Sequence, residues 1–156
     1  MAVIPVRYLP DPVLRQKAKR VKKIDSSAKK LIENMRETMH STGGVGLAAP
    51  QIGVSAQVFA VDVSQHPKTR RHHGTFVLCN AQVVAASRKE KAREGCMSVP
   101  DLTGDVKRPT RLSVVGELPG SGQRVQVDTD AFEARAIQHE IDHCAGLLFI
   151  DRVAGA

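Results

Sequence analysis

The sequence predicts an α+β fold in which mostly antiparallel β-sheets pack around a central C-terminal helix. Val-rich segments bounded by Gly, Pro, Ser and Asn fill the middle of the chain. Segments with helical periodicity lie before and after them. Strands that are grouped together, rather than alternating with helices, are typical of an α+β architecture. The 156 residues can bury a core, and residues 1–156 are expected to form a single domain.

The first helix is predicted to follow Asp25 and to end at Gly43 and Gly44, because glycine readily terminates helices. Its apolar residues recur at the helical period and form one stripe, made of Ala28, Leu31, Ile32, Met35 and Met39. The two methionines are therefore assigned to the core. Before this helix, an Asp-Pro pair resembles an N-cap followed by a first-turn proline, and predicts a short helical turn over residues 11–17.

The Val-rich segments predict four strands, at residues 57–63, 75–85, 111–117 and 123–128. The polar and basic residues 66–74 are expected to form a loop. The sequence Leu-Pro-Gly-Ser-Gly-Gln at residues 118–123 is typical of a hairpin loop.

The last helix is predicted to run from about Asp130 to Ala145, with Gly146 as the glycine that ends it. Asp130 and Glu133 have the spacing of a capping box. One face of this helix holds Phe132, Ala136, His139 and His143, and a second, apolar face holds Ala134, Ile137, Ile141 and Cys144. A helix that is apolar on two sides is buried between layers. The two histidines therefore need buried partners.

Composition excludes some classes of protein. No apolar run is long enough to cross a membrane, and the N-terminus lacks the features of a secretory signal, so a cytoplasmic location is expected. The net charge of +7 is interpreted first as a solubilising surface, with ribosomal RNA as the alternative reason. Basic residues cluster at 15–23, 68–71 and 88–93 without interleaved aromatic residues, and no sequence-specific nucleic-acid binding is expected.

The clearest motif is His-Glu-x-x-His at residues 139–143, within the last predicted helix. Residues four apart lie on one helix face, so His139 and His143 can bind one metal ion. Glu140 lies beside them and could accept a proton from a water on that ion. The alternative is a pair of partly exposed helix histidines with no metal.

A catalytic metal needs a third protein ligand besides two histidines, and the cysteines and carboxylates are the candidates. Cys144 follows His143 but faces the core side of the helix, and Cys79 lies in an apolar strand. Cys96 follows Gly95, which allows close backbone approach. Spacing alone thus favours Cys96 over Cys79.

A third segment, Gly-Val-Gly-Leu-Ala-Ala-Pro-Gln at residues 44–51, contains small residues and ends in an amide. Small residues allow a backbone to pack tightly against a site, and Gln51 could donate a hydrogen bond to a developing oxyanion. The same composition is also common in a turn followed by a close-packed strand. The Gly-Lys-Ser/Thr ending of a phosphate-binding loop is absent.

Together these segments resemble the three motifs of the peptide deformylase family, in the family's order. The motifs are Gly-x-Gly-x-Ala-Ala-x-Gln at residues 44–51, Glu-Gly-Cys-x-Ser at 94–98 and the His-Glu-x-x-His helix at 138–143. The resemblance extends over nearly the whole chain and implies that it is one catalytic domain. Ala131 stands where Gly is common in the family, and Asp101 stands where many members have Gly.

The resemblance implies one divalent metal ion, held by Cys96, His139 and His143. Fe²⁺ is the family's usual ion, and Zn²⁺, Ni²⁺ or Co²⁺ suit the same ligands. It further implies a metal-dependent hydrolase that removes the formyl group from the N-terminal formylmethionine of nascent polypeptides and releases formate. Glu140 would act as general base, with the Gln51 amide and the Met97 backbone N–H stabilising the oxyanion.

The resemblance also implies the residues that bind the substrate peptide. Val45 and Phe132 would line the methionine pocket, although plain core packing is an equal alternative for both. Backbone groups around Gly44, Gly46 and Gly95 would hold the peptide in an extended conformation. The expected partners are N-formylmethionyl peptides, nascent chains and, transiently, the ribosome. The chain ends soon after Asp151, without the C-terminal helix that some members use for ribosome docking.

Two other functions remain open from the sequence. A small metallopeptidase also carries His-Glu-x-x-His, but normally takes its third ligand from His or Glu rather than Cys. A non-catalytic relative that binds nascent chains or RNA would not need the reactive groups listed above.

Overall fold

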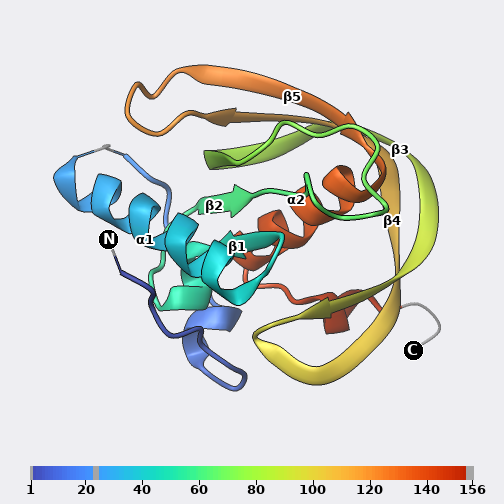
Figure 1. Cartoon of the computed structure of the whole chain (residues 1–156), viewed down its shortest axis with the longest axis horizontal. Coiled ribbons are helices and arrows are strands. Elements are labelled where there is room, and N and C mark those ends of the chain that lie inside the picture. Colours follow the sequence, from blue (N-terminus) through green and yellow to red (C-terminus); the bar gives the residue numbers. More distant parts are fainter. Residues whose placement is uncertain (1, 23–24, 154–156) are drawn as a thin grey trace.

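The structure is a computed structural model that describes residues 2–22 and 25–153 (Figure 1). The remaining residues of the predicted 1–156 domain, and the end of the basic cluster at 15–23, lie outside the described residues. Five strands form one antiparallel sheet in sequence order: β1 (Gly46–Ala48), β2 (Val58–Val61), β3 (Phe76–Cys96), β4 (Val99–Glu117) and β5 (Arg124–Asp130). The predicted antiparallel α+β fold is confirmed.

Two α-helices accompany the sheet, α1 (Ser26–Thr42) and α2 (Ala131–Cys144). The Asp25 carboxylate accepts a hydrogen bond from the Ala28 N–H at 3.1 Å and caps α1, while Gly43 ends it in the left-handed region at φ 70°. Three short 3-10 helices complete the fold: η1 (Pro12–Arg15), η2 (Ala49–Ile52) and η3 (Phe149–Arg152). None of the described helices is both long enough and apolar enough to cross a bilayer.

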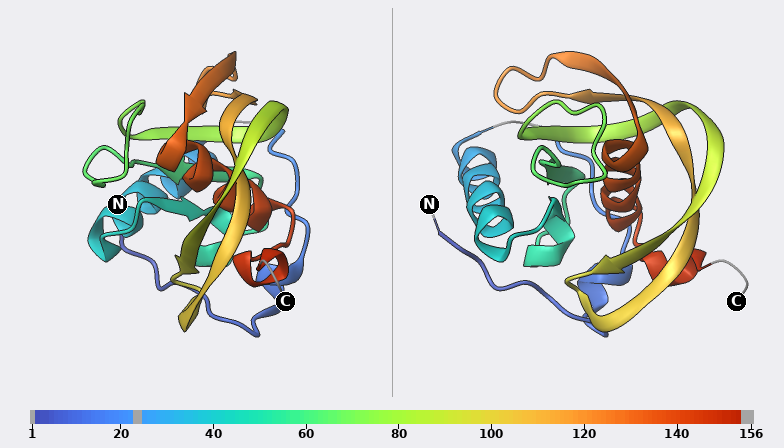
Figure 2. Two further views of the ribbon diagram at one scale, coloured as in Figure 1. Left: turned by 90° about the vertical axis from the view of Figure 1, so that its right-hand side faces the viewer. Right: turned by 45° about the vertical axis from the view of Figure 1, so that its right-hand side comes forward.

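Helix α2 lies in the middle of the molecule, as expected, and contacts β1, β2, β4 and β5 (Figure 2). The short strand β2 lies between α1 and α2, and its alternate side chains pack towards different helices. Val58 and Ala60 pack in the cluster that contains the α1 stripe, and Phe59 and Val61 pack in the cluster that contains α2. All four are buried, so β2 is covered on both faces.

The α1 stripe is buried or half-buried, as its spacing predicted, and Met35 and Met39 are both fully inaccessible to solvent. The predicted capping box at the start of α2 is wrong. The Asp130 side chain makes no cap hydrogen bond, and Glu133 instead accepts hydrogen bonds from the His73 backbone N–H at 2.8 Å and the Thr129 hydroxyl at 2.8 Å. Glu133 therefore ties α2 to the loop before β3.

The β3–β4 pair is much longer than the sequence predicted. The predicted strands stop at residue 85 and begin again at residue 111, but β3 continues to Cys96 and β4 begins at Val99. Side chains at 82–91 are exposed on both faces, so the apolar alternation that marks a strand is missing. Backbone pairing holds this segment, and Figure 2 shows the paired strands curving around α2.

Candidate metal centre and active site

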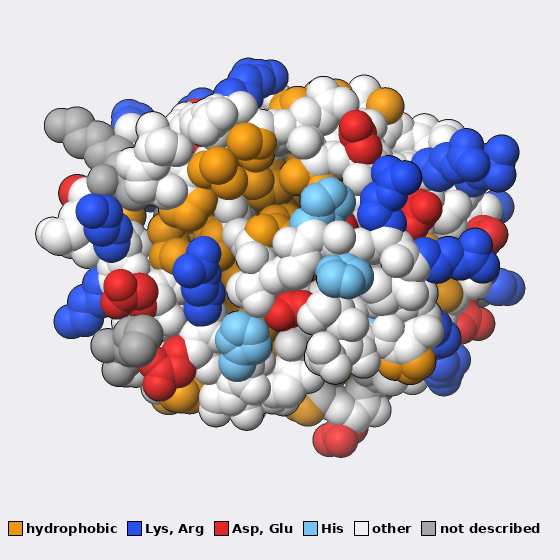
Figure 3. All heavy atoms as spheres, turned by 45° about the horizontal axis from the view of Figure 1, so that its top comes forward, with side chains coloured by type: hydrophobic (Ala, Val, Ile, Leu, Met, Phe, Trp, Pro, Cys, Tyr) orange, Lys and Arg blue, Asp and Glu red, His pale blue; other side chains and the backbone are white. Residues whose placement is uncertain are grey.

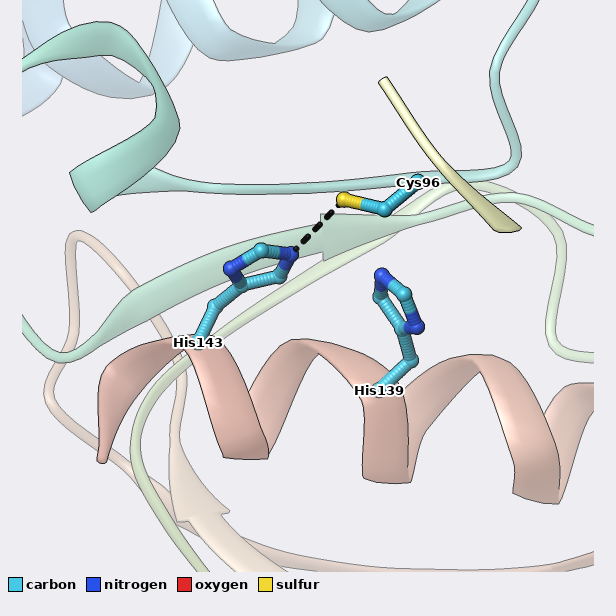
Figure 4. A group of neighbouring side chains, drawn as sticks. All are labelled: Cys96, His139 and His143. Carbon is cyan, nitrogen blue, oxygen red and sulfur yellow. Dashed lines mark hydrogen bonds between the residues drawn. The ribbon is translucent and has the colours of Figure 1, made fainter. Parts of the chain in front are cut away.

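The structure brings the three predicted ligands together from two elements (Figure 4). His139 and His143 lie one turn apart on α2, and Cys96 is the last residue of β3. The Cys96 Sγ lies 3.3 Å from His143 Nε2, and one donor atom from each of the three residues lies within 4.8 Å of the others. One ion can therefore be within reach of all three side chains.

The ligand geometry fits a tetrahedral ion. Sulfur and nitrogen ligands of one tetrahedral ion are about 3.5 Å apart, close to the separation of Cys96 Sγ and His143 Nε2. His139 Nδ1 contacts Glu94 Oε1 at 2.7 Å, which leaves Nε2 of that ring for an ion. A thiolate and two imidazoles suit several divalent transition metals.

Electrostatics also favour a cation at this position. Burial opposes a charge on His139, but hydrogen bonds with Cys96 and Glu94 outweigh it and raise the pKa of His139 to about 10. Burial, together with the neighbouring His139, holds the pKa of His143 well below its ordinary value, so His143 is a neutral imidazole. Cys96 and Glu94 therefore favour positive charge at the position of His139, between them.

Glu94 is the centre of a buried ion-pair network. Arg108 donates to both Glu94 oxygens, at 2.7 and 2.8 Å, and Arg135 donates to Oε2 at 3.1 Å. Burial alone would raise the pKa of Glu94, but the hydrogen bonds from Arg108 and His139 hold that pKa well below its usual range. Arg108 also donates to Asp142 at 2.9 Å, within the His-Glu-x-x-His helix. The network therefore fixes the His139 ring from behind.

Glu140 lies at the edge of the cavity and is only 4% exposed. Its Oε1 has no hydrogen-bond partner among the described residues, although a buried acceptor normally has one. Burial raises the pKa of Glu140 to about 7. A Cβ on Gly46 would collide with the Glu140 carboxylate, so the glycine makes room for it. Glu140 thus lines the cavity with a carboxylate of which one buried oxygen has no partner among the described residues.

Gln51 is 2% exposed, and its amide is held in one orientation. The Gln51 Oε1 accepts from the Ala48 N–H at 3.0 Å, which leaves the NH₂ group directed at the site. That group donates to the Ser98 hydroxyl at 3.2 Å and lies 3.7 Å from the Cys96 sulfur. A preorganised donor beside the proposed ligands is what oxyanion stabilisation requires.

A cavity of about 390 Å³ connects these groups. Ten of the eleven site residues singled out in the sequence line it: Gly44, Val45, Gly46, Gln51, Gly95, Cys96, Met97, Phe132, His139 and Glu140. The eleventh, His143, is fully buried behind them. His66, from the loop before β3, also lines the cavity and stacks on the Phe132 ring with centroids 3.7 Å apart.

The sequence analysis did not assign roles to His66, Glu94, Arg108 or Arg135. Glu94 could have been found, since it precedes Cys96 by two residues and extended residues two apart share one face. No local signal points to the others, which reach the site from separate elements. Cys79 and Cys144 stay in the core clusters, where burial raises their pKa values to about 11 and 12.

Comparisons with known proteins give the same answer as the geometry. The model of the polypeptide deformylase family matches residues 3–156. The peptide deformylase of Halothermothrix orenii is 45% identical over 153 residues, which cover 98% of this chain and 95% of that protein. The Thermotoga maritima peptide deformylase crystal structure is 37% identical, with a TM-score of 0.90 and 99% of each chain covered.

A Met-Ala-Ser-bound peptide deformylase from Acinetobacter baumannii is 31% identical, with a TM-score of 0.90, and the match covers 97% of this chain and 100% of that one. Family model, sequence relatives and solved structures thus agree over nearly the full length. The chain belongs to the polypeptide deformylase family, the metal-dependent hydrolases that remove the formyl group from the N-terminal methionine of nascent polypeptides.

Proposed function

We propose that Cys96, His139 and His143 hold the catalytic ion of this deformylase and that Glu140 is its general base. The observation that carries the proposal is the convergence of one thiol and two imidazoles within 4.8 Å, beside a buried carboxylate with an unpartnered oxygen. A divalent ion bound there supplies Lewis-acid polarisation and lowers the pKa of a water molecule. Side-chain and backbone groups of the protein then transfer the protons and stabilise the negative charge.

Glu140 takes the proton of the attacking water, whose oxygen adds to the formyl carbon. The Gln51 NH₂ group and the Met97 backbone N–H donate to the oxygen that becomes negatively charged. Glu140 then passes its proton to the leaving nitrogen as the carbon–nitrogen bond breaks, which releases formate and a free amine. Burial favours the protonated form of Glu140, so this carboxylate holds a proton near neutral pH better than an exposed one.

The substrate peptide is proposed to bind in the cavity of about 390 Å³, with the methionine side chain against Val45 and Phe132. Gly44, Gly46 and Gly95 leave their backbone groups open to an extended peptide. The Met-Ala-Ser-bound relative from Acinetobacter baumannii supports a peptide as the ligand. His66 extends the apolar wall through its stacking on Phe132.

We further propose Fe²⁺ as the native ion, and a cytoplasmic enzyme that meets nascent chains at or near the ribosome. The thiolate and imidazole donors suit Fe²⁺, and equally Zn²⁺, Ni²⁺ and Co²⁺. Metal analysis of protein purified without oxygen tests the choice of ion. Co-sedimentation with ribosomes that carry nascent chains tests the location.

The catalytic assignment is tested by formate release from formyl-Met-Ala, with unblocked Met-Ala as the competing substrate. We expect formate from the first and no cleavage of the second. Glu140→Gln should lower kcat by about 100-fold or more while metal remains bound, and Glu33→Gln, on the exposed side of α1, serves as the matched control. Cleavage of the Met-Ala bond would favour a metallopeptidase, and full activity of Glu140→Gln would remove Glu140 as the base.

A further inference from the structure

A second cavity, of about 380 Å³, adjoins the active-site cavity and shares Arg93, Phe132 and Arg135 with its lining. It extends over the middle of the β3–β4 pair and the first residues of α2, and the loop before β3 borders it. We call it the basic groove, after its cationic side chains Lys68, Arg70, Arg88, Arg93, Arg111 and Arg135. None of these except Arg93 and Arg135 belongs to the active-site lining.

The positive charge of the basic groove is only partly neutralised. Six cations face two carboxylates, Glu90 and Asp130. Arg135 is paired with buried Glu94, and Arg93 has a surface partner in Asp105 at 3.5 Å. The other four cations have no ion pair within residues 2–22 and 25–153, and all four are exposed. Figure 3 shows several Lys and Arg side chains together on the right of the molecule, the side on which β3 and β4 bend in Figure 1.

The position of the basic groove beside the active-site cavity indicates which ligand it binds. Two of the proposed ligands, Cys96 and His139, line the active-site cavity, and the shared residues Arg93, Phe132 and Arg135 mark where the second cavity begins. A peptide whose formyl group lies at the ligands must continue away from them, by about 3.3 Å for each extended residue. Residues soon after the methionine can therefore reach the exposed cations of the groove.

We propose that the basic groove binds acidic side chains at the third to fifth positions of the substrate, so that this enzyme deformylates chains with Asp or Glu there fastest. The inference rests on the proposed function, because it needs the formyl end at Cys96, His139 and His143. A concave site that adjoins the peptide cavity and is lined by separate cations suits individual carboxylates. An RNA phosphate backbone is the competing occupant, and the experiment separates the two.

The test compares kcat/KM for formyl-Met-Ala-Asp-Asp-Ala, formyl-Met-Ala-Ser-Ser-Ala and formyl-Met-Ala-Lys-Lys-Ala at low and at high ionic strength. Two exposed ion pairs should give the acidic peptide an advantage of about fivefold over the Ser peptide at low ionic strength. Salt should reduce this ratio towards one, because exposed charges are screened. The Lys peptide should be the slowest of the three.

The variant Arg88→Gln/Arg111→Gln removes two neighbouring cations of the groove, since Ser87 is paired with Arg111 across the two strands. We expect the acidic-to-Ser ratio to fall towards one in this variant. The control Lys29→Gln/Lys30→Gln changes the net charge equally on exposed positions of α1 and should keep the ratio. Thermal unfolding of both variants checks that neither change disturbs the fold.

Equal kcat/KM values for the three peptides in the native enzyme would overturn the groove proposal and leave the deformylase assignment intact. An unchanged ratio in Arg88→Gln/Arg111→Gln would overturn it as well. Loss of binding to a short RNA hairpin in that variant, without a peptide preference in the native enzyme, would assign the groove to RNA. No formate from any of the peptides would instead refute the proposed function itself.

Discussion

The Glu94 carboxylate lies 2.7 Å from His139 Nδ1 and so determines which nitrogen of that ring faces Cys96. Arg108 and Arg135 hold the same carboxylate from the opposite side. A carboxylate behind a metal-binding histidine fixes the orientation of the ring and increases its basicity. Glu94 is thus positioned to determine how tightly the site binds an ion.

Glu94→Gln should weaken metal affinity by about 10- to 100-fold, because the neutral amide orients His139 less strongly. Competition with a chelator, using Co²⁺ as the probe ion, measures this directly. The variant should also unfold more easily by about 3 kcal/mol, since buried Arg108 and Arg135 lose an anionic partner and Arg108 keeps only Asp142. Glu33→Gln is the control, and an unchanged Co²⁺ affinity would contradict the role of Glu94.

Gly46→Ala should displace the Glu140 carboxylate, which occupies the space of the missing methyl group. A shift of about 1 Å in a catalytic group can cost about 100-fold in rate, so kcat should fall by that order. Metal content should stay unchanged, because the atoms nearest to the added methyl group belong to Glu140 and not to the three ligands. In Gly44→Ala the added methyl meets the flexible end of Met97 at 3.2 Å and the Thr42 hydroxyl at 3.4 Å, and the loss should be smaller. Equal losses in both variants would count against this explanation.

The three thiols should differ in reactivity. Burial raises the pKa values of Cys79 and Cys144 to about 11 and 12, so both remain protonated at about pH 8. Cys96 lines the open cavity. A chromogenic disulfide reagent should therefore modify one thiol rapidly in metal-free protein and none after Co²⁺ is added. Cys79 and Cys144 should react only as the pH rises towards their pKa values or as the chain unfolds.

Asp62 should make stability depend on pH. Burial opposes its charge, but hydrogen bonds from Thr75, Ser64 and His40 outweigh it and lower the pKa of Asp62 to about 2. Because the folded pKa lies below the ordinary value of 3.8, the stabilisation is fully present above about pH 4 and is lost as the pH falls towards 2.

Asp62→Asn should therefore reduce the free energy of unfolding by about 2 kcal/mol at neutral pH, and the difference from the native chain should shrink in acid. Urea unfolding at a series of pH values measures it. A difference that stays constant down to the acid limit would refute the linkage. Asp62 also tethers the ends of the loop that carries His66, through Ser64 and Thr75.

Ala131→Gly should stabilise the protein by about 1 kcal/mol, because Ala131 has φ 48° and a left-handed conformation disfavours any side chain with a Cβ. Asp101 shares this feature, with φ 66°. At both positions the resemblance to the family leads us to expect glycine, and the backbone conformation accounts for that expectation. Ala134→Gly, inside the same helix, should have the opposite sign. Denaturant unfolding of the two variants provides the comparison.

The sequence predicts those elements in which the spacing of apolar residues matches the residues that are buried. The stripe of α1 and the two faces of α2 repeat at the helical period because each packs against a core. The segment from Arg88 to Lys91 lacks this pattern, since it is held by backbone pairing with β4 and its side chains face solvent. The capping box failed for a related reason: Glu133 has tertiary partners in His73 and Thr129 that local spacing does not reveal.

The site residues likewise fall into two groups, those that a local motif predicts and those that only the fold brings together. His139 and His143 are brought together by one helix, so their spacing alone predicts a shared ion. Cys96 joins them only through the curvature of the β3–β4 pair, which no short motif encodes. Arg108 bridges β3 and α2, through Glu94 and Asp142, and is visible only once the fold is known.

Cys96 stands at the tip of the hairpin that joins β3 to β4, whereas both imidazoles belong to α2. The proposed ligand set is therefore complete only after this hairpin has closed over the helix. A nascent or partly folded chain offers an ion two nitrogens and no correctly placed sulfur. An ion held by all three residues would bind once this hairpin lies against the helix, and it would join β3 to α2.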